Sequence, residues 1–414
     1  MRRQRGLVEL MGLAALVGLG VLAKPAVATV TTENSASILV FPKVIACTDP
    51  TCVIAVNGVR NTIIQITNTS NSIRYAHCFY VDAELTDPTL PEGPNNLPLW
   101  TETDFDIVLT KQQPTHWVVS TGRFSPATEP LTCRNVNCNP ATSGGVVPPA
   151  NCCDSGLDPG RVPPVSPTFQ GELKCIEVDA SGAPEGGNAL KGEATIEDPI
   201  TGDVSKYNAV GLKGFDNQDR NNTLCLGAGP TEICPMGAEY ESCPDRWYID
   251  APVVGAADTI ASAFCPPGVA CTAMNANLTV VPCSEDFEHQ SPQDIVLQFI
   301  VTNEFEQSFS NSTTFRCWKS IDLATLSTNF TVGTLGGSVS VSRMTSLLAP
   351  TSTTPLGPPP GAGVIPILEE SHTLVIGPGG SLTRAAQNVH SGPENKTAAD
   401  YIVIPGGQGG DLPQ

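Results

Sequence analysis

The sequence predicts an all-β chain of antiparallel β-sandwich domains with disulfide-pinned loops. Three observations predict this class. The 414 residues include 38 glycines and 37 prolines, an excess that interrupts helices and favours turns. Short β-branched runs bounded by turn residues occur throughout, whereas no long stretch places apolar residues at helical spacing. Fifteen cysteines are available to form disulfides.

The strands are expected in a series of hairpins along the chain. The strongest short signal is the Asn57-Gly58 turn after the apolar run 53–56. The strict alternation at 338–342 predicts a strand with one buried face and one solvated face. The other expected strands are 62–67, 73–81, 105–109, 117–120, 194–196, 204–210, 330–332, 372–376, 381–383 and 401–404.

The first 28 residues have the pattern of a secretory signal peptide. Arg2, Arg3 and Arg5 form a basic start, an apolar run follows, and residues 26–28 supply a small-residue cleavage site. The uninterrupted apolar core, residues 10–23, is shorter than the roughly 20 residues that span a bilayer. We therefore expect export to the cell surface, the periplasm or the extracellular space, and no transmembrane segment.

The cysteine spacing is typical of disulfides that close small loops. The candidates with short spacings are Cys47 with Cys52, Cys133 with Cys138, and Cys265 with Cys271. No Cys-x-x-Cys pair occurs, which argues against a zinc ribbon and a thioredoxin-like site. Because the number of cysteines is odd, at least one is unpaired or pairs between chains. Cys78 is a candidate, and a buried, inert thiol is the expected character.

The charge balance excludes one class of partner. The chain has 22 basic and 41 acidic residues, a formal net charge of −19. Such a field repels nucleic acid, so we expect no nucleic-acid partner. The negative charge is compatible with a solvated protein at the cell surface. The partner to consider is then another surface protein or a glycan, and the cofactor to consider is calcium.

Composition changes along the chain suggest the domain boundaries. Strand signals of similar order occur around 65–107 and 298–332, which favours two related sandwiches. The expected organisation is a signal peptide at 1–28, a first β-sandwich at 29–214 with a Pro/Gly/Cys-rich insertion at about 125–168, a Cys-rich connecting region at 215–282, a second β-sandwich at 283–405 with a Pro-rich loop at about 348–363, and a disordered tail at 406–414.

One stretch resembles a known class of module. Residues 63–83 combine a Thr-Asn-Thr-Ser-Asn-Ser turn with an aromatic strand. This stretch resembles immunoglobulin-like β-sandwich modules of uncharacterised exported bacterial proteins. The resemblance implies a structural or surface role and carries no functional residue with it.

Two polar segments are candidate metal sites. Asp216, Asp219 and Asn221 could supply calcium with oxygen donors from one flexible loop, although the EF-hand pattern is absent. A helical turn at 285–289 would bring Glu285, Glu288 and His289 onto one face, where they could bind a divalent metal or act as acid and base. The alternative for both segments is a hydrated loop between strands.

No catalytic signature occurs in the sequence. There is no Gly-x-Ser-x-Gly elbow, no His-Glu-x-x-His and no Walker-type phosphate loop. The adjacent Trp247 and Tyr248 are candidates for stacking on a sugar, whereas Trp117 and Trp318 are expected in the core. We therefore expect a non-catalytic exported protein with a structural, adhesive or binding role. The alternatives are a secreted polysaccharide-active hydrolase and a carbohydrate- or calcium-binding module.

Overall fold

The computed structural model confirms the all-β class. It describes residues 30–48, 59–87, 89–90, 92, 95–123, 159–198, 202–227, 230–257, 274–290, 294–349, 361–374, 381–391 and 400–405. The expected signal peptide, the Asn57-Gly58 turn, the tail and most of both low-complexity insertions lie outside these residues. None of the helices in the described part of the chain has the length and apolarity that a membrane span requires.

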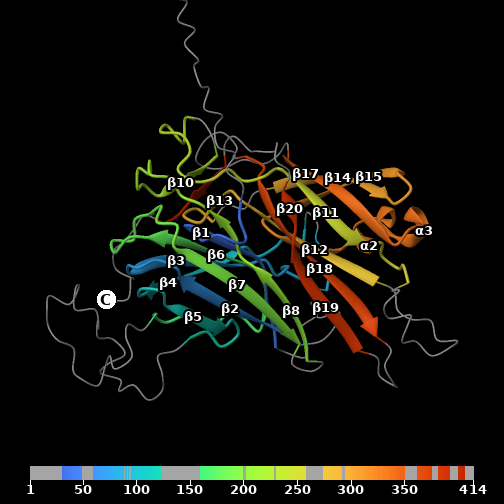
Figure 1. Cartoon of the computed structure of the whole chain (residues 1–414), viewed down its shortest axis with the longest axis horizontal. Helices are drawn as coiled ribbons and strands as arrows, with labels where there is room; N and C mark the ends of the chain where they lie inside the picture. Colours follow the sequence, from blue (N-terminus) through green and yellow to red (C-terminus); the bar gives the residue numbers. More distant parts are fainter. Residues whose placement is uncertain are drawn as a thin grey trace, which may run out of the picture.

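The N-terminal half forms one nine-stranded antiparallel sheet (Figure 1). Its strand order is β4-β3-β6-β1-β2-β7-β8, with β5 also paired to β2 and β9 to β1. The strands are β1 (Ile38–Cys47), β2 (Arg60–Asn68), β3 (Arg74–Asp82), β4 (Thr101–Leu109), β5 (Pro114–Val118), β6 (Thr168–Val178), β7 (Leu190–Asp198), β8 (Asp203–Asn208) and β9 (Val210–Leu212).

This sheet folds over where β1 meets β2. The two strands pair only at Ala46 with Asn61 and at Cys47 with Arg60, after which β2 pairs with β5 instead. The layer containing β3, β6 and β1 therefore packs against the layer containing β5, β2 and β7, and both contribute side chains to one core. The indole of Trp117 in β5 donates a hydrogen bond to the hydroxyl of Tyr80 in β3 across this core.

The C-terminal half contains three smaller sheets. Their orders are β15-β14-β17-β11-β20, β16-β12-β18-β19 and β10-β21-β13. The elements are β10 (Thr223–Leu226), β11 (Arg246–Pro252), β12 (Met274–Pro282), β13 (Glu285–Asp286), β14 (Asp294–Asn303), β15 (Ser308–Arg316), β16 (Lys319–Asp322), α2 (Leu323–Leu326), η1 (Thr328–Phe330), α3 (Val332–Leu335), β17 (Val339–Leu348), β18 (Val364–Leu374), β19 (Ser381–Asn388), β20 (His390–Ser391) and β21 (Asp400–Val403).

The two halves share a hydrophobic core. All ten residues of β1 are buried, because alternate side chains enter two different cores. Leu39 and Phe41 pack within the N-terminal half, whereas Ile38 and Val40 pack with C-terminal residues such as Phe287. A strand covered on both faces is a nearly continuous apolar run, and in β1 the one charged residue is the buried Lys43. The β1, β3 and β6 layer is thus the middle of the molecule.

The structure places two regions differently from the sequence-based expectation. Residues 215–282, expected as a connecting region, contribute β11 and β12, which pair with β17 and β18. The prediction of a strand at 330–332 is wrong, because Phe330 ends η1 and Val332 begins α3, and Thr331 between them forms only an isolated bridge with Val254. The 3-10 turn begins where the Ser327 side chain accepts a hydrogen bond from the Asn329 backbone, and it directs the Phe330 ring onto Phe299.

Candidate functional site

A cleft with a volume of about 600 Å³ lies beside one end of the five-stranded sheet. Strands β11 and β17 and the end of β14 form one wall, and β18, β19 and the start of β12 form the other. The volume is in the range of small-molecule sites. The lining residues are Asp250, Ala251, Pro252, Ala257, Met274, Thr302, Asn303, Glu304, Ser338, Val339, Ser340, Val341, Glu370, His372 and Gln387.

The exposed face of β17 gives the cleft its apolar surface. Burial alternates along β17 as predicted, which leaves Val339 and Val341 pointing outward with 55% and 38% of their surface exposed. Val341 pairs with Asp250 on one side and Thr302 on the other, so an acidic and a hydroxyl side chain flank it in one row. Two valines exposed side by side on a sheet are available for contact with a ligand.

Three carboxylates line the same cleft. They are Asp250, Glu304 and Glu370, and His372 follows Glu370 on the same face of β18. The Gln387 amide donates hydrogen bonds to Glu370 Oε1 at 2.8 Å and to the Asp250 carbonyl at 3.2 Å, so it connects the two walls. Burial raises the pKa of Glu370, and the nearby His372 opposes this shift. The carboxylates can therefore attract a cation, and burial shifts Glu370 toward its protonated form.

The helical turn expected at 285–289 is wrong, because Glu285 and Asp286 form strand β13. Pairing with β21 directs the Glu285 side chain inward, where its carboxylate forms a buried ion pair with Lys174. The His289 ring instead contacts Asp286, 3.0 Å from its carboxylate oxygen, and Glu288 is exposed. The three predicted ligands do not converge.

In the other segment that was predicted to bind a metal, the side-chain oxygens of Asp219 and Asn221 accept hydrogen bonds from the backbone of the same segment. Asp219 Oδ1 accepts from the Asn221 backbone at 3.0 Å, and Asn221 Oδ1 accepts from the Thr223 backbone at 2.6 Å. Asp216 is exposed and does not join them. These bonds are typical of Asx turns. Among the residues that the structure describes, no three His, Cys, Asp or Glu side chains form a group able to hold a metal ion.

Trp247 and Tyr248 point to opposite faces of β11. Trp247 is buried, and its indole donates to the Val364 carbonyl at 2.9 Å, so it is a core residue rather than a sugar platform. Tyr248 is 39% exposed on the same face of the sheet as Asp250. Trp117 and Trp318 are buried as predicted.

The described cysteines form three disulfides, Cys78–Cys175, Cys225–Cys234 and Cys243–Cys283. Cys47 is also disulfide-bonded, and its proposed partner Cys52 lies outside the described residues, as do Cys133, Cys138, Cys265 and Cys271. The prediction that Cys78 is unpaired is therefore wrong, because it is bonded to Cys175. Cys317 is the free one in the described part of the chain, and burial holds its thiol pKa well above the usual range, so it is inert.

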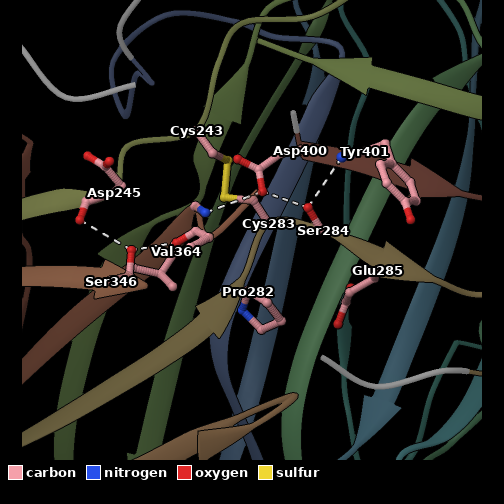
Figure 2. Close-up of a disulfide and its surroundings, with 12 residues drawn as sticks. Cys243, Asp245, Pro282, Cys283, Ser284, Glu285, Ser346, Val364, Asp400 and Tyr401 are labelled. Atoms are coloured by element: carbon pink, nitrogen blue, oxygen red, sulfur yellow. Dashed lines mark hydrogen bonds between the residues drawn. A yellow bond between two sulfur atoms is a disulfide. The ribbon is translucent and has the colours of Figure 1, made fainter. Parts of the chain in front are cut away.

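A buried carboxyl lies beside the Cys243–Cys283 bond (Figure 2). Asp400 Oδ1 accepts hydrogen bonds from the Ser284 hydroxyl at 2.6 Å and the Gly363 backbone at 3.2 Å. Burial raises the pKa of Asp400 to about 7. A Cβ atom on Gly361 would lie 2.8 Å from the carboxylate oxygens, so the loop closes over this group and leaves no room for a ligand.

No protein-family model matches this chain, and no curated protein matches it. The candidate site therefore depends on geometry alone. Sequence reasoning did not identify Asp250, Glu304, Glu370 and His372, because they come from three separate strands or turns. The available signal was the alternation of β17 and β18, which identifies outward-facing positions but not what lies opposite them.

Proposed function

We propose that this chain is an exported, non-catalytic β-sandwich protein with a binding role, and that the cleft beside β17 and β18 is its ligand site. The observation that carries the proposal is a cleft of about 600 Å³ with an apolar surface and three carboxylates in its lining. Three disulfides among the described cysteines support an oxidising compartment. The leader-like first 28 residues and the resemblance of residues 63–83 to immunoglobulin-like modules of exported proteins support export and a surface location.

The lining favours a small organic ligand that carries a positive charge. Asp250, Glu304 and Glu370 would attract an amine or guanidinium group, and Val339 and Val341 would contact its apolar part. The exposed Tyr248 lies on the same sheet face, one row from Val341, and could extend the contact.

The test is a thermal-shift panel on the mature chain from Thr29 onward, produced in an oxidising compartment. The panel contains apolar amines, glycan fragments, calcium and a chelator. A ligand at a hundred times its dissociation constant should stabilise the fold by about 2.7 kcal/mol. The Asp250→Asn/Glu370→Gln double variant should lose the amine shift, whereas the exposed control Glu288→Gln should keep it. A flat amine response from a cooperatively melting protein would contradict the proposal.

A polysaccharide-active hydrolase is the second candidate. Glu370 favours it, because a carboxyl with a raised pKa in a cleft with two other carboxylates is suited to act as a general acid. Reducing-end assays on a polysaccharide panel separate the two functions. Turnover that Glu370→Gln abolishes would replace the non-catalytic proposal, and no turnover would leave binding in place.

A further inference from the structure

A buried lysine contacts a side-chain amide and a carboxylate at the junction of the two halves. Lys43 lies on β1, Asn277 on β12 and Glu369 on β18. The Lys43 ammonium nitrogen Nζ is 2.7 Å from Asn277 Oδ1 and 2.7 Å from Glu369 Oε2. The side chains of Lys43 and Glu369 are each 3% exposed, and Asn277 is partly buried. The Lys43 amine therefore contacts both an amide carbonyl and a proton acceptor, and the residues that carry these two groups are cross-strand partners on β12 and β18.

The surroundings of Lys43 shift its amine toward the neutral, nucleophilic form. Burial lowers the pKa of Lys43, and Arg60 lowers it further, although Glu369 opposes both effects. The guanidinium of Arg60 also donates to Glu369 Oε1 at 2.6 Å, which fixes the carboxylate beside the amine. A lysine desolvated next to another cation is an activated nucleophile.

The amide of Asn277 is held from both ends. Its Oδ1 accepts a hydrogen bond from the Ser320 hydroxyl at 2.7 Å in addition to the lysine contact. Its Nδ2 donates to Asp322 Oδ1 at 3.0 Å. Donors on the carbonyl oxygen stabilise the negative charge that develops there when a nucleophile attacks Cγ, and Asp322 keeps the amide nitrogen oriented.

We propose that Lys43 and Asn277 join in an intramolecular amide bond, with Glu369 transferring the protons. Glu369 takes one proton from the ammonium, and the neutral Nζ attacks Asn277 Cγ. The Nζ–Cγ bond forms and the Cγ–Nδ2 bond breaks. Glu369 passes its proton to Nδ2, which leaves as ammonia, and then takes the second proton from Nζ. The products are a secondary amide, one ammonia molecule and protonated Glu369, and no oxidant or cofactor is needed.

The bond would connect the middle layer to the C-terminal half. Lys43 and Asn277 are 234 residues apart in the sequence. Strand β1 belongs to the nine-stranded sheet, and β12 is a central strand of the four-stranded sheet. A covalent link here would hold the two halves together independently of the disulfides and would persist under reducing conditions.

The test is the intact mass of the folded, full-length mature protein after reduction and alkylation. We expect the mass to be lower than the sequence mass by one ammonia molecule. A protease digest should contain one species in which the Lys43 and Asn277 peptides are joined. Lys43→Arg and Glu369→Gln should have their full sequence masses, whereas the exposed control Lys206→Arg should retain the ammonia loss.

The wild-type measurement decides the proposal even if a variant fails to fold. A wild-type mass equal to the sequence mass, with separate Lys43 and Asn277 peptides, would overturn it. An ammonia loss without joined peptides would also overturn it, because it would indicate cyclisation of an asparagine instead.

Discussion

Replacing Asp400 with asparagine should change how the stability of this protein depends on pH. Burial raises the pKa of Asp400 from 3.8 to about 7. Because this folded-state pKa is above the unfolded value, the folded state binds the proton more tightly. The contribution of Asp400 to the free energy of unfolding is therefore fully present below about pH 4 and is lost as the pH rises through about 7.

The magnitude follows from the two pKa values. The interval from 3.8 to about 7 corresponds to about 4 kcal/mol of unfolding free energy at roughly 1.4 kcal/mol per pKa unit. An asparagine at this position cannot ionise, and its side-chain oxygen can still accept the hydrogen bonds from Ser284 and Gly363. The variant should therefore keep at pH 8 the stability that the wild type loses.

The assay is urea unfolding of wild type and Asp400→Asn between pH 4 and pH 8. Other buried carboxyls also titrate, because burial raises the pKa of Glu177 to about 7 and of Asp82 to about 6. The relevant quantity is thus the free energy of unfolding of the wild type minus that of the variant at each pH. This difference should fall by about 4 kcal/mol from low to high pH. Exposed Asp216→Asn is the control. Parallel curves for wild type and Asp400→Asn would refute the reasoning.

Three further changes test the packing and the cross-links. The Cys78–Cys175 disulfide closes a loop of 97 residues, and replacing both cysteines with alanine should lower the free energy of unfolding by about 4 to 5 kcal/mol. Guanidinium unfolding measures this loss, and a loss under about 1 kcal/mol would contradict stabilisation through chain entropy. Phe287→Ala should cost about 3 to 5 kcal/mol in thermal unfolding because its ring stacks on Phe79 at 4.3 Å, and an unchanged midpoint would contradict this packing. Lys43→Arg should cost about 5 kcal/mol under reducing conditions if the amide closes 234 residues, whereas equal stability would argue against the bond.

Local sequence patterns predicted much of the secondary structure. The strand expected at 62–67 is part of β2 (Arg60–Asn68), and the one expected at 73–81 corresponds to β3 (Arg74–Asp82). The alternation at 338–342 gave both β17 and the identity of its outward-facing valines. These predictions succeed because strand periodicity and turn chemistry depend on neighbouring residues.

Local patterns failed where tertiary contacts override them. Glu285 had the spacing of a helical turn but lies in β13, because pairing with β21 and the ion pair with Lys174 determine its conformation. Trp247 looked available for a ligand but is buried by the packing around β18. In each case the deciding neighbour lies more than a hundred residues away.

The sequence by itself determined the all-β class, many of the strands, the acidic charge and the presence of disulfides. Only the tertiary structure decided that Cys78 pairs with Cys175, that Glu370 faces Asp250 across a cleft, and that Lys43 meets Asn277. The physical reason is that composition and periodicity are properties of local segments, whereas a site is made of side chains that sheet pairing and a shared core bring together from distant segments.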